Sequence, residues 1–321
     1  MNTNPPNTKS LKIILWNANG LKQNELELLH LLIQSKIDIA LITETHYTSS
    51  TNYFFPGFQV YKANHPDGTA HAGSAILVSN QIQHYPLQSL QLPSIQATNI
   101  QIVLNHIPTT LSSVYCPPLP AITPPQIENF RNSLGRSFIA GGDFNAKNTQ
   151  WGSRLTNSRG RLFLDNIQKL GCSFISPNGP TYWPTHINRQ PDILNFFLTS
   201  IPKHIRHKIQ NSCEISSDHT PVILEINGST TYKPPRSTLA KGPVNWEKFS
   251  TILENNTNLK ISLKTSSEIE IAPQDFVNSI KAAISDSSFT PNPNKPPNSN
   301  QYDITLNIKT LIIEKRRARS R

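Results

Sequence analysis

The chain has 321 residues, which is about two domains' length at roughly 150 residues each. Apolar residues make up 36% and charged residues 16%, both below the averages of about 45–50% and about 25% in globular proteins, and 26 residues are proline. This composition allows one large core. It excludes a collagen, a coiled coil and a wholly disordered chain.

Charge is unbalanced, with 30 basic and 20 acidic residues and a net charge of +10. Such a chain favours polyanionic partners, either nucleic acid or an anionic membrane surface. The longest apolar runs, at 37–42, 75–78 and 221–226, are far shorter than the roughly 18 residues of a membrane span, and residues 1–10 lack the apolar segment of a signal peptide. Three scattered cysteines without a CxxC pair disfavour a disulfide framework or a zinc site and favour a reducing compartment.

Alternating strands and helices are predicted over the first 228 residues. Short apolar runs predict strands at 11–15, 37–42, 74–78, 98–104, 111–115, 138–140, 193–198 and 222–226. Helical spacing is present after Gly20, at 125–133 and at 160–170. Many strands with few helices between them favour an α/β fold of two mixed sheets packed face to face, with the helices outside.

The composition changes at about residue 228. A Thr, Lys and Pro rich stretch at 229–242 predicts a linker, and apolar spacing from Trp246 and from Phe276 predicts two short helices. A Pro, Asn and Ser tract at 286–300 predicts disorder. The last ten residues hold five basic residues, which fits a nuclear-import signal, a nucleic-acid arm or a truncated end. We therefore expect a disordered segment at 1–10, a catalytic-type domain at 11–227, and a partly disordered connector at 228–321.

Four acidic residues occupy the ends of predicted strands. Glu44 and Asp143 follow strands, whereas Asp192 and Asp218 precede them. The start of one strand lies beside the end of an antiparallel neighbour, so all four carboxylates can share one rim. The same rim would receive Asn17, Asn19, Tyr115, Asn145 and His219.

Clustered carboxylates repel one another unless a cation neutralises them or they share protons. Oxygen ligands favour Mg²⁺ or Mn²⁺ over zinc. Such an ion, with a histidine and amide groups near it, suits phosphoryl transfer in which a carboxylate orients or deprotonates a water molecule.

Several motifs in a fixed order resemble one superfamily. They are WNANG (16–20), TET (43–45), VYCPP (114–118), GGDFNAKNTQWGS (141–153), the segment 181–192 and SSDH (216–219). The series resembles the endonuclease/exonuclease/phosphatase superfamily, which includes the apurinic/apyrimidinic endonucleases. More narrowly, YCPP and GDFNA with WGS are similar to the endonuclease domain of jockey-type non-LTR retrotransposons. The resemblance covers residues 11–227 and implies a four-layer α/β/β/α sandwich.

This resemblance implies a role for each matching residue. Glu44 matches the principal metal ligand, assisted by Asn17. Asp143 matches the group that orients or deprotonates the attacking water, with Asn145 beside it. His219, held by Asp192, matches the pair that contacts the scissile phosphate; a purely structural buried pair is the less favoured alternative.

The other matches lie around this centre. Tyr115 matches a tyrosine near the phosphate, and Asp218 matches a carboxylate on the metal or leaving-group side. Thr181 and Ser217 match supporting hydroxyl groups. Asn19 stands where the repair enzymes carry an aspartate, and an amide oxygen, being a weaker ligand than a carboxylate, weakens any second metal position.

Basic residues follow the GDFN motif. If Lys147, Arg154, Arg159 and Arg161 flank the acidic rim, they would contact DNA phosphates, which positions a duplex without reading its sequence. An ordinary solvated surface explains the same residues.

The resemblance implies a Mg²⁺- or Mn²⁺-dependent endonuclease that nicks double-stranded DNA and leaves a 3′-hydroxyl to prime reverse transcription. In a full-length relative, the partners would be element RNA and a reverse transcriptase, with no membrane, inside the cell and acting in the nucleus. The segment 312–321 resembles the connector before a reverse transcriptase, so we expect a chain truncated before that enzyme. Two alternatives stay open: a phosphoesterase acting on inositol phosphates or lipids, and a nucleic-acid-binding element fragment without catalysis.

Overall fold

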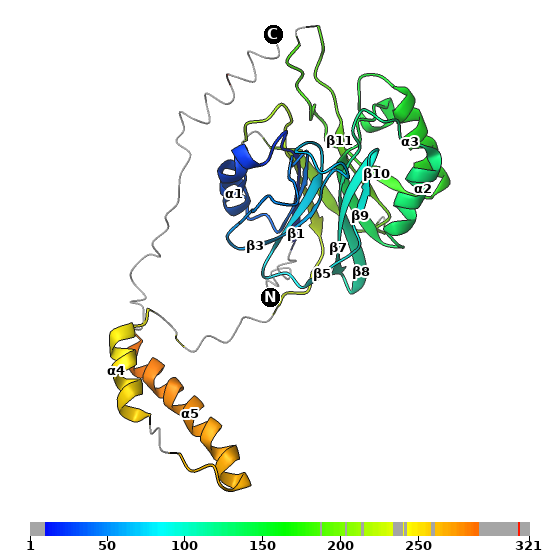
Figure 1. Cartoon of the computed structure of the whole chain (residues 1–321). Helices are drawn as coiled ribbons and strands as arrows, with labels where there is room; N and C mark the ends of the chain where they lie inside the picture. The colour runs from blue at the N-terminus through cyan, green and yellow to red at the C-terminus, as the bar shows by residue number, and fades with distance from the viewer. Residues whose placement is uncertain are drawn as a thin grey trace, which may run out of the picture. The chain divides into compact units, whose positions relative to one another are not determined.

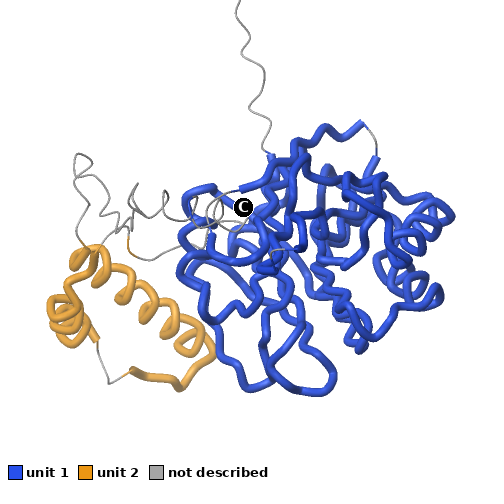
Figure 2. The backbone as a smooth tube through the Cα atoms, turned by 90° about the horizontal axis from the view of Figure 1, so that it is seen from above, with its two compact units in different colours: residues 1–233, 303–321 blue, residues 234–302 orange. Residues whose placement is uncertain are grey.

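The computed structural model describes residues 10–186, 188–202, 204–212, 215–233, 240, 243–257, 261–288 and 314. The chain divides into two compact units, residues 1–233 with 303–321 and residues 234–302 (Figure 2). The disorder predicted at 1–10 falls almost wholly outside the described residues, as do most of the tract at 286–300 and of the basic C-terminal segment. Within the described part, no helix combines the length and apolar character needed to cross a membrane.

The first sheet has six strands in the order β12-β13-β1-β2-β4-β3. Their bounds are β12 His207–Asn211, β13 Val222–Asn227, β1 Ser10–Asn17, β2 Ile39–Thr43, β4 Ser74–Ser79 and β3 Phe58–Ala63. Helix α1 (Glu25–Gln34), preceded by the short 3-10 helix η1 (Lys22–Asn24), crosses from β1 to β2. These two strands are therefore parallel, and every other pair in the sheet is antiparallel.

The second sheet has seven strands. Six follow the order β10 Ser173–Ile175, β11 Asn195–Thr199, β9 Phe138–Asp143, β8 Ile107–Tyr115, β7 Ile95–Leu104 and β5 His84–Pro86, and β6 Leu90–Leu92 pairs with β7. Helix α2 (Pro124–Ser133) joins the parallel strands β8 and β9, and the 3-10 helix η2 (Thr149–Trp151) and helix α3 (Ser158–Lys169) follow β9. This sheet is also mixed.

Side-chain alternation along the strands divides the core into three layers. Leu15 and Leu41 of the first sheet and Phe197 of the second belong to the cluster between the sheets. Trp16, the next residue on β1, packs with α1 instead, and Phe196 packs with the buried faces of α2 and α3. Figure 1 shows α1 on one side of the paired sheets and α2 and α3 on the other. The four-layer α/β/β/α sandwich expected from the sequence is therefore confirmed.

Residues 229–233, which we predicted as the start of a linker, instead add two isolated bridges to the sandwich. Thr230 pairs with Leu104 and Tyr232 with Ile82. In the second unit, α4 (Trp246–Asn256) and α5 (Ser266–Ser287) begin at the side-chain caps Asn245 and Thr265. Both helices lie at the predicted apolar repeats, although α5, at 22 residues, is longer than the short helix expected.

Two adjacent glycines let β9 run closely past its neighbours. A Cβ on Gly141 would lie 2.8 Å from Leu41 Cδ1 and 2.7 Å from Phe197, and one on Gly142 would collide with the carbonyl oxygen of Val114. Strand β9 therefore continues through both glycines to Asp143, beyond the predicted end at 140.

We expect Gly142→Ala to lower the free energy of unfolding by about 1–3 kcal/mol, because β8 must shift to relieve the collision with Val114. Gly179→Ala is the matched control, since its new Cβ would meet atoms of Asn211 only at 3.7 Å or more. Urea unfolding followed by circular dichroism measures both variants. Equal stability of the two would show that β8 and β9 are not packed as described.

Candidate active site

Strand ends from both sheets meet at one rim. In the first sheet, Asn17 ends β1 beside Thr43 at the end of β2, and Glu44 follows. In the second sheet, Asp143 ends β9 directly between Tyr115 of β8 and Asn195 of β11. The register of the strands thus sets the positions of Asn17, Tyr115, Asp143 and Asn195, and Glu44 lies one residue beyond its strand.

The amide nitrogen of Asn17 joins the two sheets at this rim. It donates to Glu44 Oε1 and to Asp143 Oδ2, each at 2.8 Å. The amide oxygen accepts the backbone N–H of Asn19 at 3.0 Å. Asn17 was predicted to assist a metal ligand, and this geometry has its nitrogen bridging the two acids while its oxygen is engaged by the backbone.

The two bridged carboxylates have different environments. Burial acts to raise the pKa of Glu44, but hydrogen bonds from His46, Asn17 and Tyr115, together with the charge of His219, outweigh it and lower that pKa. Burial, aided by the negative charge of Glu44, raises the pKa of Asp143. Opposite shifts in neighbouring carboxyl groups are the pattern by which sites divide acid and base roles.

Backbone strain also concentrates here. The backbone φ is 49° at Glu44 and 48° at Asn145. Both values lie in the left-handed region, which residues other than Gly and Asn rarely adopt. The backbone N–H of Asn145 donates to Asp143 Oδ1 at 3.0 Å, and its side chain donates to the Cys116 carbonyl at 3.1 Å. Residues that the surrounding structure holds in such unfavourable backbone conformations cluster at functional sites.

His219 is buried and held from several sides. Its backbone N–H donates to Ser217 Oγ, which in turn donates to the carbonyl of Asn17, both at 2.9 Å. Its Nδ1 lies 2.7 Å from Asn195 Oδ1, and its Nε2 faces Asp143 Oδ2 at 3.8 Å. Asn195 Nδ2 is buried without a hydrogen-bond partner.

The expectation that Asp192 holds His219 is wrong. Asp192 Oδ2 pairs with Lys147 Nζ at 2.9 Å, and Oδ1 accepts the backbone N–H groups of Arg154 and Ile193. Strand β11 begins at Asn195, two residues later than predicted, so Asn195 occupies the rim position opposite Asp143. Sequence reasoning missed Asn195, and the only signal for it was its place at the start of the apolar run NFFL.

The remaining predicted residues gather around this centre. Thr181 Oγ1 accepts the N–H groups of Leu194 and Asn195 at 2.9 Å and so fixes the start of β11. Tyr115 donates to Glu44 from the end of β8, and burial raises its pKa. Asp218 Oδ1 accepts from Asn19 Nδ2 at 3.3 Å.

The four predicted DNA-contacting cations differ in their surroundings. Arg159 donates to the carbonyl oxygens of Cys116, Pro117, Pro118 and Phe144, at 2.7–3.4 Å. Lys147 pairs with Asp192, as described above. Arg154 and Arg161 are exposed. Arg159 and Lys147 therefore stabilise the loops behind the rim, and only the other two face solvent without such ties.

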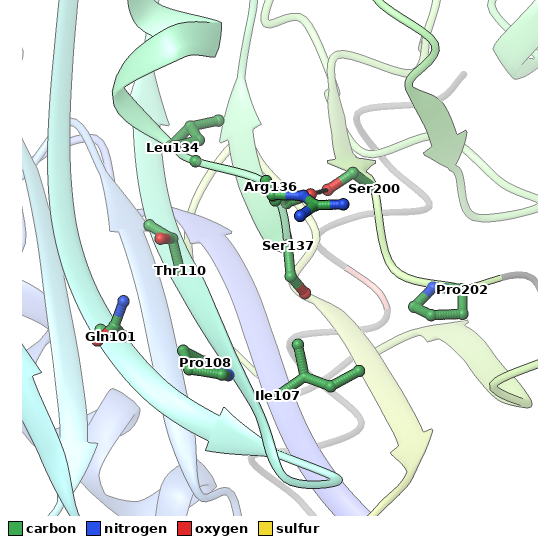
Figure 3. Close-up of a pocket in the computed structure, with 10 residues that line it drawn as sticks. Gln101, Ile107, Pro108, Thr110, Leu134, Arg136, Ser137, Ser200 and Pro202 are labelled. Atoms are coloured by element: carbon green, nitrogen blue, oxygen red, sulfur yellow. Dashed lines mark hydrogen bonds between the residues drawn. The ribbon is translucent and has the colours of Figure 1, made fainter.

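Two hollows lie at opposite edges of the sandwich. A cavity of about 220 Å³, lined by Asn19, Ser217 and Asp218 among others, adjoins the rim. A larger one of about 480 Å³ lies where β8 and β9 begin, away from the carboxylates; Figure 3 shows Arg136 and Ser200 side by side in it. Of these two cavities, the smaller one adjoins the polar side chains of the rim.

The donor set at the rim fits a hard divalent cation. Glu44 and Asp143 offer carboxylate oxygens beside the Asn17 amide, and Asp218 contacts Asn19. Within the described part of the chain, the basic side chain paired with the buried Asp143 is His219, at 3.8 Å. Among the described residues, the one group of His, Cys, Asp or Glu side chains whose donor atoms all lie within 4.8 Å is elsewhere, at His65, Asp67 and His71.

In metal-free buffer at pH 7, we expect Asp143→Asn to raise the free energy of unfolding by about 1 kcal/mol. The pKa of Asp143 is raised on folding, so its ionisation destabilises the folded chain. This gain should fade as the pH falls below the ordinary aspartate pKa of 3.8, where the carboxyl becomes protonated in both the folded and the unfolded chain.

The matched variant is Asp192→Asn, which should instead lower the free energy of unfolding by about 1–3 kcal/mol, because Lys147 loses its partner. Urea unfolding at several pH values measures both. A destabilised Asp143→Asn chain would contradict the described electrostatics of the rim.

Sequence comparison relates this site to mobile elements. The profile of the family described as "Endonuclease-reverse transcriptase" matches residues 109–223. The RNA-directed DNA polymerase from mobile element jockey of Drosophila funebris is 29% identical over 310 residues, covering 97% of this chain and 34% of the relative. The probable RNA-directed DNA polymerase from transposon X-element of Drosophila melanogaster is 29% identical over 312 residues, with the same shares. The chain thus spans about a third of the length of these relatives.

Solved structures support the fold. The endonuclease domain of TRAS1, a telomere-specific non-LTR retrotransposon, superposes with a TM-score of 0.58 at 22% identity, over 67% of this chain and 98% of that domain. The AP endonuclease LMAP from Leishmania major gives a TM-score of 0.53 at 14% identity, over 68% and 88%. The resemblance found in the motifs is therefore confirmed: the chain is similar to jockey-type mobile-element proteins over most of its length, and its sandwich has the fold of these endonuclease structures.

Proposed function

We propose that the sandwich is a Mg²⁺- or Mn²⁺-dependent endonuclease that nicks one strand of duplex DNA and leaves a 3′-hydroxyl. The observation that carries this proposal is the convergence of Asn17, Glu44, Asp143 and His219 on one rim, with Asn17 bridging the two carboxylates. The match of residues 109–223 to the family described as "Endonuclease-reverse transcriptase" supports the same class of activity.

Asp143 is proposed as the group that orients and deprotonates the attacking water. Its raised pKa brings a carboxylate closer to the working pH, as a general base requires. The backbone N–H of Asn145 and the amide of Asn17 fix its two oxygens. The base is thereby aimed before substrate arrives.

Glu44, whose pKa is lowered, is proposed as the principal cation ligand, with Asp218 and Asn19 on the other side. When bound, a divalent cation would neutralise charge on the phosphate oxygens. His219 Nε2 and the Tyr115 hydroxyl face the same space and would hydrogen-bond the scissile phosphate.

Duplex DNA would lie across this rim. We propose Arg154 and Arg161, which are exposed, as phosphate contacts that position the duplex. In a longer protein of this kind, element RNA and a reverse transcriptase would use the free 3′-hydroxyl, and the site of action would be the nucleus.

Plasmid nicking in Mg²⁺ tests the proposal. We expect Asp143→Ala and His219→Ala to lower the nicking rate at least about 100-fold, because each removes a group acting on the reacting atoms. Arg136→Ala, at the opposite edge of the sandwich, should nick like the native chain. Primer extension by a DNA polymerase directly from the nicks reports the 3′-hydroxyl.

Equal nicking by the native chain and by the Asp143→Ala and His219→Ala variants would contradict the site assignment. Hydrolysis of inositol phosphates or phospholipids without DNA cleavage would instead favour the phosphoesterase alternative. Tight DNA binding without nicking by the native chain would favour a non-catalytic fragment.

The contact between His219 and Asn195 predicts a second result. We expect Asn195→Asp to increase the nicking rate several-fold, because a carboxylate stabilises an imidazolium better than an amide does and leaves no unpaired buried N–H group. Asn195→Ala should decrease the rate about tenfold or more, because His219 Nδ1 loses its partner. The conservative control Asp192→Glu alters the neighbouring loop without touching His219. If substitutions at residue 192 changed the nicking rate and those at residue 195 did not, Asn195 would not be the partner of His219.

A further inference from the structure

A cluster of metal-binding side chains lies outside the candidate active site. Strands β3 and β4 pair from Ala63 and Ser74, so residues 64–73 form their connecting loop. In this loop His65 Nδ1 lies 2.9 Å from Asp67 Oδ1, and His71 Nε2 lies 3.6 Å from Asp67 Oδ2. The two imidazole rings are 4.2 Å apart between centroids. One short loop thus gathers two nitrogen donors and one carboxylate.

The loop orients these donors by its own hydrogen bonds. The Thr69 hydroxyl donates to Asp67 Oδ1 at 3.0 Å and therefore accepts from His71 Nδ1, 2.6 Å away. His71 then carries its proton on Nδ1, and the lone pair of Nε2 points towards Asp67. A histidine whose second nitrogen is fixed by a hydrogen bond is the usual arrangement of a metal ligand.

Backbone bonds also hold the loop in shape. The N–H of Gly68 donates to the carbonyl of His65 at 3.1 Å, and the N–H of Thr69 donates to Asp67 Oδ1 at 2.9 Å. At its far end, the carbonyl of Ala72 accepts the N–H of His46 at 3.0 Å. Backbone hydrogen bonds near the start of the loop and at its end therefore hold the segment that carries the cluster.

Donor type and spacing select the class of ion. Tetrahedral zinc with ligands at about 2.0–2.1 Å places its donors about 3.3 Å apart. One ligand atom from each of the three side chains lies within 4.8 Å of the other two, so small side-chain rotations would bring all three to one ion. Two imidazoles with one carboxylate suit Zn²⁺, Co²⁺ or Ni²⁺, whereas Mg²⁺ prefers oxygen. The cysteine spacing that disfavours a zinc site concerns thiolates and does not bear on these residues.

We propose that His65, Asp67 and His71 form a binding site for one transition-metal ion of the zinc class, with a fourth coordination position open to water or an exogenous ligand. Ser74 pairs with Thr43, so the loop lies at the same edge of the first sheet as Glu44. The bound ion would fix the loop beside the segment Glu44 to His46. This site is chemically separate from the oxygen-donor site proposed for Mg²⁺.

The test uses the full chain, stripped of metal with a chelator and returned to buffer with excess Mg²⁺ to occupy oxygen sites. Co²⁺ is titrated by visible absorption, which reports tetrahedral coordination, and Zn²⁺ by calorimetry. We expect saturation at one ion per chain. His71→Ala and Asp67→Asn should each bind at least about tenfold more weakly, and Thr69→Val, which removes only the orienting hydroxyl, about tenfold more weakly.

His207→Ala, which removes an exposed histidine on β12, is the matched control and should bind like the native chain. Asp143→Asn should also bind normally, which separates this site from the nuclease proposal. Circular dichroism confirms that each variant is folded. Equal Zn²⁺ binding by the native and His71→Ala chains would overturn the proposal, and so would the absence of saturable binding by the native chain. In either case His65 and Asp67 would form only a hydrogen-bonded pair.

Discussion

One amide nitrogen connects the two halves of the sandwich at the place where its acids meet. Asn17 Nδ2 donates at 2.8 Å to Glu44 from the first sheet and to Asp143 from the second. Asn17 and Asp143 are buried, so without a donor between them the two carboxylates would face each other where water screens them poorly. A third carboxylate at position 17 would add charge instead of relieving it. A neutral donor is therefore the residue type that this rim requires.

Strand register sets the level of several other rim side chains. Asp143 lies level with Tyr115 on one side and Asn195 on the other, and Asn17 lies level with Thr43. Inside the sandwich, Ser113 Oγ donates to the carbonyl of Ile42 at 2.8 Å, which fixes the level of one sheet against the other. A slip of one residue would turn each of these side chains to the opposite face.

The sequence predicts the interior of the fold better than its margins. The eight predicted strands and three helices of the sandwich are all present, because buried strands and amphipathic helices are marked by apolar runs and spacing. Strands β3, β5, β6, β10 and β12 were missed. Strands β5, β6 and β10 have three residues each, too few for a pattern. Strand β3, FQVYKA, is an edge strand whose side chains are mostly only partly buried, so it lacks a clear apolar run. Strand β12, HKIQN, is a polar edge strand whose pairing is made by the backbone.

The candidate site shows the same division. The order of motifs was enough to predict four residues that the structure brings together at the rim, Asn17, Glu44, Asp143 and His219. It was not enough to predict their partners. Whether His219 meets residue 192 or residue 195 depends on where β11 begins, and apolar side chains at Ile193 and Leu194 hide that boundary. Partner assignment needs register, which composition and spacing do not contain.

The hydrogen bonds of Arg159 show that part of the positive charge of this domain is engaged within the protein. Residues 1–228 hold 16 basic and 12 acidic residues, which looks like a mild attraction for polyanions. Yet Arg159 is bonded to four carbonyl oxygens and Lys147 to Asp192, so neither is free to displace counterions from a phosphate backbone. The salt dependence of DNA affinity counts only cations that reach phosphates. Formal charge therefore overstates the electrostatic attraction of this domain for a polyanion.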